Sequence, residues 1–292
     1  MKFASEYLKA KKIHKMEKKY LSIVIPVKNV EKWEENIIQN VNLVNNQNEG
    51  DVEILFIYSK KMDSSVLKLK QKLFDKKNIK FIKDEQTGIY SAMNKGIYVS
   101  NGEFIQFMGS DDSFNKKNFK KVINFLKKNL DTGIILCEAI LSTDNINEKE
   151  SGNKLACGRG GRIHWFFSSP RIHQAMIYNN KLIKKYNLRY LTSLKVTSDY
   201  IFTAELLSLT RNIKKLDLWF ISYYKYGFSS EFSVLSNYLE HIKGFAQSKF
   251  LKKYLLIVIF LRFGMIFNKG LRKFIYPIYR YLKKTFISYP SN

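Results

Sequence analysis

Two adjacent carboxylates, Asp111 and Asp112, follow directly on an apolar run and are the residues of this sequence best placed for chemistry. The run, residues 104–108, is too short for a helix and lies between Gly102 and Gly109, which predicts a buried strand. Open α/β sheets bind ligands where their strands end, and two neighbouring carboxylates favour a cation held between them and a phosphate. A polar turn that caps the next helix is the alternative, and this segment alone leaves both interpretations open.

A third carboxylate, Asp199, is expected in the first turn of a helix that runs through Ser208. Ser198 has a side chain suited to an N-cap, which would place Asp199 at the positive end of the helix dipole. Helix capping is by itself a sufficient reason for an aspartate at this position.

Short apolar strands and amphipathic helices alternate through the first half of the chain. Strands are expected at 22–27, 53–58, 79–82 and 104–108, and helices at 31–44, 64–74, 88–99 and 115–130. Such alternation implies parallel strands joined by right-handed crossovers. We therefore predict an α/β fold, a three-layer α/β/α sandwich around a mostly parallel sheet.

From Gly133 onward the pattern changes. Residues 134–137 and 139–141 are expected to form strands of a different sense. Arg159 and Arg162 lie in a cationic, glycine-rich loop, where they either close over phosphates or remain solvated loop charges.

The formal charge of +25, from 50 Lys and Arg against 25 Asp and Glu, ordinarily indicates a nucleic acid or an anionic membrane as partner. The excess is uneven, because no acidic residue follows Glu240. Cys137 and Cys157, the only cysteines, lack metal-site spacing, so we expect reduced thiols in a cytosolic protein. The Lys-rich residues 1–20 contain no apolar stretch and are not expected to be a secretory signal.

Residues 254–267 form an apolar run that Arg262 interrupts. A membrane-spanning helix needs ~20 apolar residues, so this run is too short. Cations flank it and are interleaved with aromatic residues toward the C-terminus, a pattern typical of a helix in a bilayer interface. We expect residues 249–292 to attach to an anionic membrane surface. A helical hairpin packed on the preceding domain is the alternative.

Four stretches, taken together, resemble the inverting glycosyltransferases of family 2, which have the A-type nucleotide-sugar-binding fold. They are the opening strand and turn at 22–29, the Gly-Ile-Tyr-Ser-Ala-Met-Asn-Lys-Gly-Ile run at 88–97, residues 102–112, and His173-Gln174-Ala175 followed by Ser198-Asp199-Tyr200. The resemblance covers roughly residues 20–229 and rests on the order and spacing of these stretches. The organisation it implies is a basic lead at 1–19, a glycosyltransferase domain at 20–240 with a nucleotide-sugar half (20–130) and an acceptor half (131–240), and a basic amphipathic helical tail at 241–292.

The resemblance implies transfer of a sugar from a nucleotide-diphosphate sugar, UDP-linked as first choice, to a hydroxyl of a lipid-linked glycan with inversion. Such a reaction would serve bacterial surface polysaccharide synthesis at the inner face of the cell membrane. Asp112 would hold a divalent cation, Mn²⁺ or Mg²⁺, against the diphosphate, and Asp111 would bind the ribose or the same metal. Asp199 matches the general base, and a single carboxylate suffices for direct displacement.

Other residues at matching positions are implied in binding. The acceptor or diphosphate would contact His173, Gln174, Arg159 and Arg162. A histidine packed beneath the site with its hydrogen bonds satisfied is an equal interpretation of His173. The donor would contact Pro26, Val27, Asn29, Tyr58, Ser91, Asn94, Lys95 and Asp111.

Tyr58, Gln86 and Ser91 stand where relatives usually carry acids. A tyrosine can stack on a base but is a weaker acceptor than a carboxylate for the N–H of uracil. A relative without catalytic activity is therefore one alternative, and a non-enzymatic nucleic-acid-binding protein is another. The densest acid-free stretch lies outside the sheet domain, so we expect no nucleic-acid partner.

Overall fold

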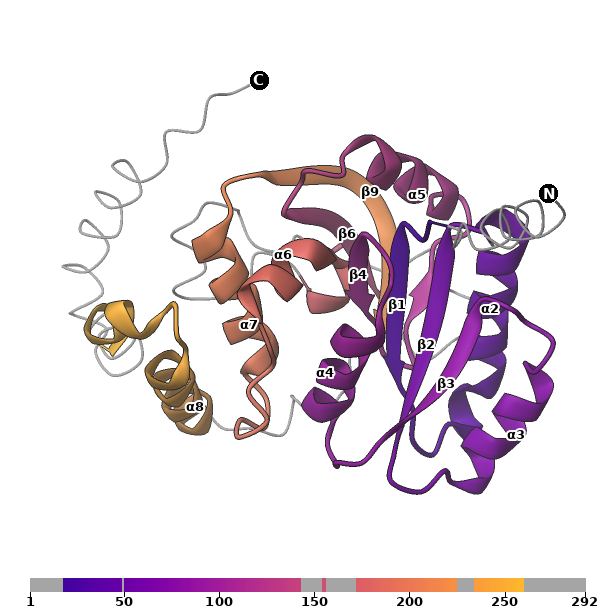
Figure 1. Ribbon diagram of the computed structural model, residues 1–292, viewed down its shortest axis with the longest axis horizontal. Coiled ribbons are helices and arrows are strands. Elements are labelled where there is room, and N and C mark those ends of the chain that lie inside the picture. The colour runs from indigo at the N-terminus through magenta and orange to yellow at the C-terminus, as the bar shows by residue number, and fades with distance from the viewer. Residues whose placement is uncertain (1–17, 49, 143–153, 156–171, 225–233, 260–292) are drawn as a thin grey trace, which may run out of the picture.

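The computed structural model describes residues 18–48, 50–142, 154–155, 172–224 and 234–259 (Figure 1). The predicted N-terminal lead at 1–19 lies almost wholly outside these residues, as does the tail from residue 260 onward.

Strand β1 (Leu21–Pro26) lies inside a parallel half-sheet. It pairs in parallel with β2 (Val52–Ser59) on one side and β4 (Phe104–Phe107) on the other, and β2 pairs in parallel with β3 (Ile79–Asp84). Helices cover both faces of such a sheet, so its inner strands are apolar on both sides. The four predicted strands of this half are confirmed.

Beyond β4 the sheet includes antiparallel strands. The strand order is β3-β2-β1-β4-β8-β6-β9-β5, and β7 pairs with β6 off this path. The added strands are β5 (Ser113–Phe114), β6 (Ile134–Ser142), β7 (Lys154–Leu155), β8 (Met176–Asn179) and β9 (Ile213–Tyr224). Residues 134–137 and 139–141, predicted as strands of a different sense, form the one strand β6, and this prediction is wrong: β8 is antiparallel to both β4 and β6, so β6 runs in the same direction as β4. The whole sheet is thus mixed: β1 to β4 form a continuous parallel half, and β6 and β9 form a further parallel pair.

Two helical layers cover the sheet (Figure 1). One contains α2 (Glu34–Asn48), α3 (Ser64–Lys72) and α5 (Phe119–Lys128). The other contains α4 (Ile89–Val99), α6 (Asn180–Tyr186) and α7 (Ser198–Leu209), with α8 (Val234–Gln247) outside α7. Short 3₁₀ turns occur at η1 (Glu31–Trp33), η4 (His173–Ala175) and η6 (Lys252–Tyr254). Helix α7 is buried around almost its whole circumference because it lies between the sheet and α8, as an apolar helix requires.

Helix α4 approaches β1 closely at Gly96. A Cβ atom at this position would lie 2.3 Å from Cγ1 of Val24, so any larger residue would push the helix off the strand. This contact explains a glycine in the interior of a helix, where it otherwise costs stability.

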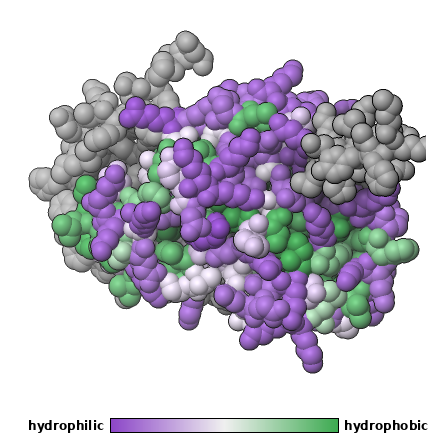
Figure 2. All heavy atoms as spheres, viewed as in Figure 1, coloured by the Kyte–Doolittle hydropathy of each residue, from purple (hydrophilic) through white to green (hydrophobic). Residues whose placement is uncertain are grey.

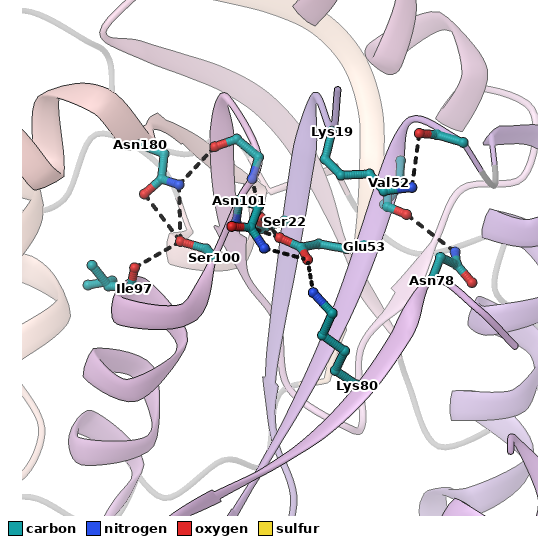
Figure 3. Close-up of polar contacts among 12 residues, drawn as sticks. Lys19, Ser22, Val52, Glu53, Asn78, Lys80, Ile97, Ser100, Asn101 and Asn180 are labelled. Carbon is teal, nitrogen blue, oxygen red and sulfur yellow. Dashed lines mark hydrogen bonds and ion pairs between the residues drawn. The ribbon is translucent and has the colours of Figure 1, made fainter. Parts of the chain in front are cut away.

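A buried polar network ties together the amino ends of the parallel strands (Figure 3). The Glu53 carboxylate is 2% exposed and accepts hydrogen bonds from Ser22 Oγ at 2.7 Å and Asn101 N–H at 2.6 Å. Lys80 Nζ lies 3.1 Å from it. Burial alone would raise the pKa of Glu53, but these donors hold it below its ordinary value. Structural contacts therefore occupy the amino edge of the parallel strands. The opposite, carboxyl edge is the one that the loops leave available.

The described start of the C-terminal segment packs against α7 and α8. Leu251 and Val258 are fully buried with residues of α7, whereas Leu256 is 81% exposed and Ile257 46%. Within the residues that the structure describes, no helix is long and apolar enough to cross a membrane.

Candidate active site

The carboxyl ends of the parallel strands share one edge of the sheet and bring together residues far apart in the sequence. Pro26 ends β1 beside Ile57, and the buried Val27 donates its N–H to the Ile57 carbonyl at 2.9 Å. Tyr58 lies near the end of β2 and is partly exposed. The predicted donor-binding residues Pro26, Val27 and Tyr58 therefore lie on neighbouring strand ends.

Asn29 follows β1 in a left-handed backbone conformation, with φ at 50°. Its N–H donates to Asp63 Oδ2 at 3.0 Å, and Asp63 also caps α3 through Val66 N–H at 2.9 Å. Burial would raise the pKa of Asp63, but donors from Ser65, Asn29 and Val66 hold it below the usual value. The α3 cap thus fixes the loop that carries Asn29.

The loop after β4 directs its two carboxylates toward one backbone position. Gly109 N–H donates to Asp112 Oδ2 at 2.8 Å, and the Asp112 carbonyl accepts from Asn36 at 2.7 Å and Asn40 at 2.9 Å. A Cβ atom at Gly109 would lie 2.3 Å from Asp111 Oδ1 and 3.0 Å from Asp112 Oδ2. Only glycine leaves room for both carboxylates. Asp112 is 1% exposed, and Asp111 is the more accessible of the pair.

This pair fits a divalent cation that a diphosphate also binds. Mg²⁺ in phosphate sites is held by one or two carboxylates, with the remaining ligands from phosphate and water. Burial raises the pKa of Asp111, which the nearby Lys32 opposes, so a cation would favour the ionised form. Across the described parts of the chain, no group of three or more His, Cys, Asp or Glu converges as a metal site. The two carboxylates alone therefore suit a shared cation and do not make a site enclosed by protein.

Sequence analysis missed Asp84, a buried carboxylate at the end of β3. It lies opposite Ser59 in the β2–β3 register and accepts from Ser91 Oγ at 2.6 Å and Gln86 N–H at 3.3 Å. The hydrogen bond to Asp84 therefore places Ser91 at the carboxyl edge of the sheet. The signal available in the sequence was the place of Asp84 as the last residue of a parallel strand. The carboxyl ends of parallel strands lie at one edge of the sheet, where Asp111 also lies.

Two other predicted donor-binding residues lie in contacts away from this edge. The Asn94 side chain donates to the Tyr190 carbonyl at 2.9 Å and accepts from the Tyr190 N–H at 2.8 Å. The Lys95 ammonium lies 5.8 Å from the ring centre of Tyr98. Asn94 therefore joins α4 to the segment before α7.

Asp199 occupies the first turn of α7, as expected, but the N-cap is Thr197 and not Ser198. The helix therefore begins at Ser198 itself, one residue earlier than predicted. The Ser198 Oγ accepts from Leu191 N–H at 2.6 Å. Burial raises the pKa of Asp199 to about 6. The Tyr200 N–H, which donates to its carboxylate at 2.7 Å, lowers the pKa by less than burial raises it. A carboxyl group with this pKa is ionised at neutral pH and can still exchange protons.

Aromatic side chains surround the start of α7. Tyr90, from the first turn of α4, donates its hydroxyl to the Val196 carbonyl at 2.5 Å. Its ring stacks on Tyr190, which stacks in turn on Phe202 at 4.3 Å between ring centres. Burial and the Asp199 charge raise the pKa of Tyr90, so its hydroxyl remains protonated. These rings keep the region around Asp199 apolar.

His173 is buried in the same aromatic group. Its Nε2 lies 2.7 Å from the Tyr190 hydroxyl, and its ring stacks on Phe107. Burial lowers the pKa of His173 to about 3, so the ring is neutral at physiological pH and cannot attract a diphosphate by charge. Its contacts are those of a histidine packed beneath the site.

Gln174 lies beside His173, where its carbonyl accepts from Gln106 Nε2 at 2.6 Å and its side chain is partly exposed. Arg159 and Arg162 fall outside the described residues.

A family model described as Glycosyl transferase family 2 matches residues 22–187, more than half of the chain. The chain belongs to this family. The match covers the strand ends, both acidic residues of the β4 loop and His173.

Comparison with individual proteins agrees with this family. The minor teichoic acid biosynthesis protein GgaB of Bacillus subtilis is 27% identical over 145 residues, a match that spans 46% of this chain but 16% of GgaB. S. aureus TarS 1-349 in complex with UDP-GlcNAc superimposes with a TM-score of 0.62 at 17% identity, covering 90% of this chain and 81% of TarS. The mannosyltransferase PcManGT from Pyrobaculum calidifontis, in complex with GDP-Man and Mn²⁺, gives 0.58 at 12% identity, covering 94% and 77%. At these identities the structures establish the shared fold.

The raised pKa of Asp199 predicts a distinctive dependence of stability on pH. A group whose pKa is higher in the folded state stabilises the protein below its unfolded pKa, and this contribution is lost as pH rises through about 6. Asp199→Asn should therefore be more stable than the native protein at pH 8, by on the order of 1–3 kcal/mol, and equal to it near pH 4. Chemical denaturation across this pH range measures the difference.

Asp63→Asn is the matched control, because the pKa of Asp63 is lowered. This variant should be less stable than the native protein at pH 7, and the deficit should shrink as the solution is acidified. A stability difference for Asp199→Asn that does not change with pH would contradict the assignment of a raised pKa.

Proposed function

We propose that this family 2 member transfers a sugar from a nucleotide-diphosphate sugar, UDP-linked, to a hydroxyl of a lipid-linked glycan, with inversion at the transferred carbon. The observation that carries the proposal is Asp199, a partly buried carboxylate with a pKa of about 6 at the start of α7. The two carboxylates after β4 supply the second requirement, a place for the diphosphate and its cation.

Asp199 accepts the proton of the acceptor hydroxyl as that oxygen attacks the sugar from the face opposite the leaving diphosphate. A base works best when its pKa lies near the working pH, and the surrounding rings produce this value by excluding water. Asp111 and Asp112 would hold Mn²⁺ or Mg²⁺, which neutralises charge on the diphosphate when bound. Direct displacement needs one base and therefore gives an inverted product.

Substituting the base tests this assignment. Asp199→Asn keeps the shape of the side chain and its acceptor for the Tyr200 N–H, but it cannot take a proton. Turnover should fall by roughly 10²–10⁴-fold with donor affinity nearly unchanged. Transfer to a lipid-linked acceptor and calorimetric titration with UDP measure the two effects, and near-normal transfer would remove Asp199 from the mechanism.

The nucleotide is proposed to lie along the ends of β1, β2 and β3. Asp84 supplies the carboxylate that Tyr58 lacks, because it stands on the neighbouring strand next to Ser59 and can accept the uracil N–H. Tyr58 offers its ring as a stacking surface. UDP as first choice is supported by TarS, whose complex contains UDP-GlcNAc, whereas the PcManGT complex contains GDP-Man.

Separate variants distinguish the metal-dependent part of donor binding from the part that recognises the base. In UDP titrations, Asp111→Ala and Asp112→Ala should abolish the gain in affinity that Mn²⁺ gives the native protein. Asp84→Asn should keep that gain but weaken binding about 10- to 100-fold with or without Mn²⁺, the loss expected for a charge-assisted hydrogen bond. Retention of the full Mn²⁺ effect in both alanine variants would contradict the metal assignment.

The acceptor is proposed to be presented at an anionic membrane surface, in synthesis of a bacterial surface polysaccharide. The name of GgaB supports this product class. At the end of the molecule where α8 lies, apolar and hydrophilic side chains lie side by side (Figure 2). In the segment that follows α8, Leu256 and Ile257 are exposed, as are Lys252 and Lys253. This composition suits an interfacial contact with anionic lipid.

Surface substitutions test attachment without removing the buried Leu251 and Val258. The quadruple variant with Leu256→Ser, Ile257→Ser, Lys252→Glu and Lys253→Glu should bind phosphatidylglycerol vesicles more than about tenfold less tightly, since each lysine near the surface adds about 1 kcal/mol. The control is Phe74→Ser with Lys77→Glu, which alters an apolar residue 86% exposed after α3. Equal loss in both variants, or equal binding to neutral phosphatidylcholine, would contradict a specific membrane face.

A further inference from the structure

A carboxylate from α8 binds the backbone immediately before α7. Glu240 Oε1 accepts from Lys195 N–H at 2.7 Å, while Oε2 accepts from Val196 N–H at 3.0 Å and Thr197 N–H at 3.1 Å. Thr197 Oγ1 lies a further 3.3 Å from Oε2. Burial would raise the pKa of Glu240, but these donors hold it below its ordinary value. Three successive N–H groups aimed at one anion form a backbone nest.

This nest ends two residues before Asp199. Its other side is held by Tyr90, whose hydroxyl donates to the Val196 carbonyl between two of the amides that Glu240 binds. The segment therefore has one contact from α4, in the nucleotide-sugar half, and one from α8. Together they set where the first turn of α7 begins.

We propose that Glu240 is a positioning residue that holds Asp199 in its working place through the backbone of residues 195–197. This inference rests on the proposed role of Asp199 as base. Removing the Glu240 carboxylate leaves three N–H groups without their acceptor, so the segment turns toward water to satisfy them. A displacement of about 1 Å at a reacting group can lower turnover about 10²-fold.

The pairing of α7 with α8 does not itself depend on Glu240. Ser248 Oγ donates to the buried Glu205 carboxyl at 2.5 Å, near the other end of α7. A Cβ atom at Gly244 would lie 2.5 Å from Ile201, so the two helices are in close contact there. Loss of Glu240 should therefore leave the helices packed while it releases the segment before Asp199.

A double-mutant cycle in the full chain separates positioning from general stability. Glu240→Ala should lower kcat about 10- to 100-fold and leave the donor KM within about twofold. In the Asp199→Asn background the same substitution should cause no further fall, because there is no base left to position. Hydrogen exchange at the amides of residues 195–197 should become faster in Glu240→Ala.

Ser248→Ala is the matched control, since it removes a contact between the same helices far from Asp199. It should lower the melting temperature with kcat unchanged. Two results would overturn the positioning role of Glu240 and leave the base assignment intact. One is a fall in kcat from Glu240→Ala that is equal in both backgrounds. The other is an unchanged kcat in Glu240→Ala while Asp199→Asn is inactive. Near-normal transfer by Asp199→Asn would overturn both.

Discussion

Taking a carboxylate out of water is costly unless hydrogen-bond donors meet it, and this constraint organises the molecule. Glu53, Asp63 and Glu240 each receive several donors, and the pKa of each is lowered. Asp199, among aromatic rings, accepts from the backbone N–H groups of Tyr200 and of Asp199 itself, and its pKa is nevertheless raised by burial. The first three therefore fix backbone segments, whereas Asp199 remains able to take a proton. Burial raises the pKa of all four: at Glu53, Asp63 and Glu240 the donors outweigh it, whereas at Asp199, which is the most deeply buried, they do not.

The two edges of the parallel half-sheet differ for the same reason. At the amino edge the Glu53 network satisfies its own members, and nothing there is left to react (Figure 3). At the carboxyl edge, glycine at position 109 lets two carboxylates approach the same backbone atom. Such a pair is favourable only with a cation or a proton present. The fold thus brings two negative charges together on one side of the sheet.

Helix α4 connects the half that carries these acids with the half that carries Asp199. Gly96 brings it against β1, Asn94 binds the Tyr190 backbone, and Tyr90 reaches the segment before α7. The run at 88–97 therefore joins the two halves of the molecule, while its Ser91 binds Asp84 at the carboxyl edge. These contacts follow from the direction of α4, which leaves the carboxyl edge after its first turn, so that its later residues face the second half of the molecule.

The strands, the layers and the two acidic segments could be predicted from the residues, because apolar periodicity and strand ends depend on neighbours in the chain. Glu240 could not be recognised in that way, and the strand end that marks Asp84 does not by itself say which strand lies beside it. Asp84 matters because β3 lies beside β2. Glu240 matters because α8 folds back over α7, and its contacts are made across 43 to 45 positions of sequence. The neutral state of His173 and the pKa of Asp199 likewise depend on rings from distant segments. Local pattern determines which groups are present, and only packing decides which of them are paired, buried or left to react.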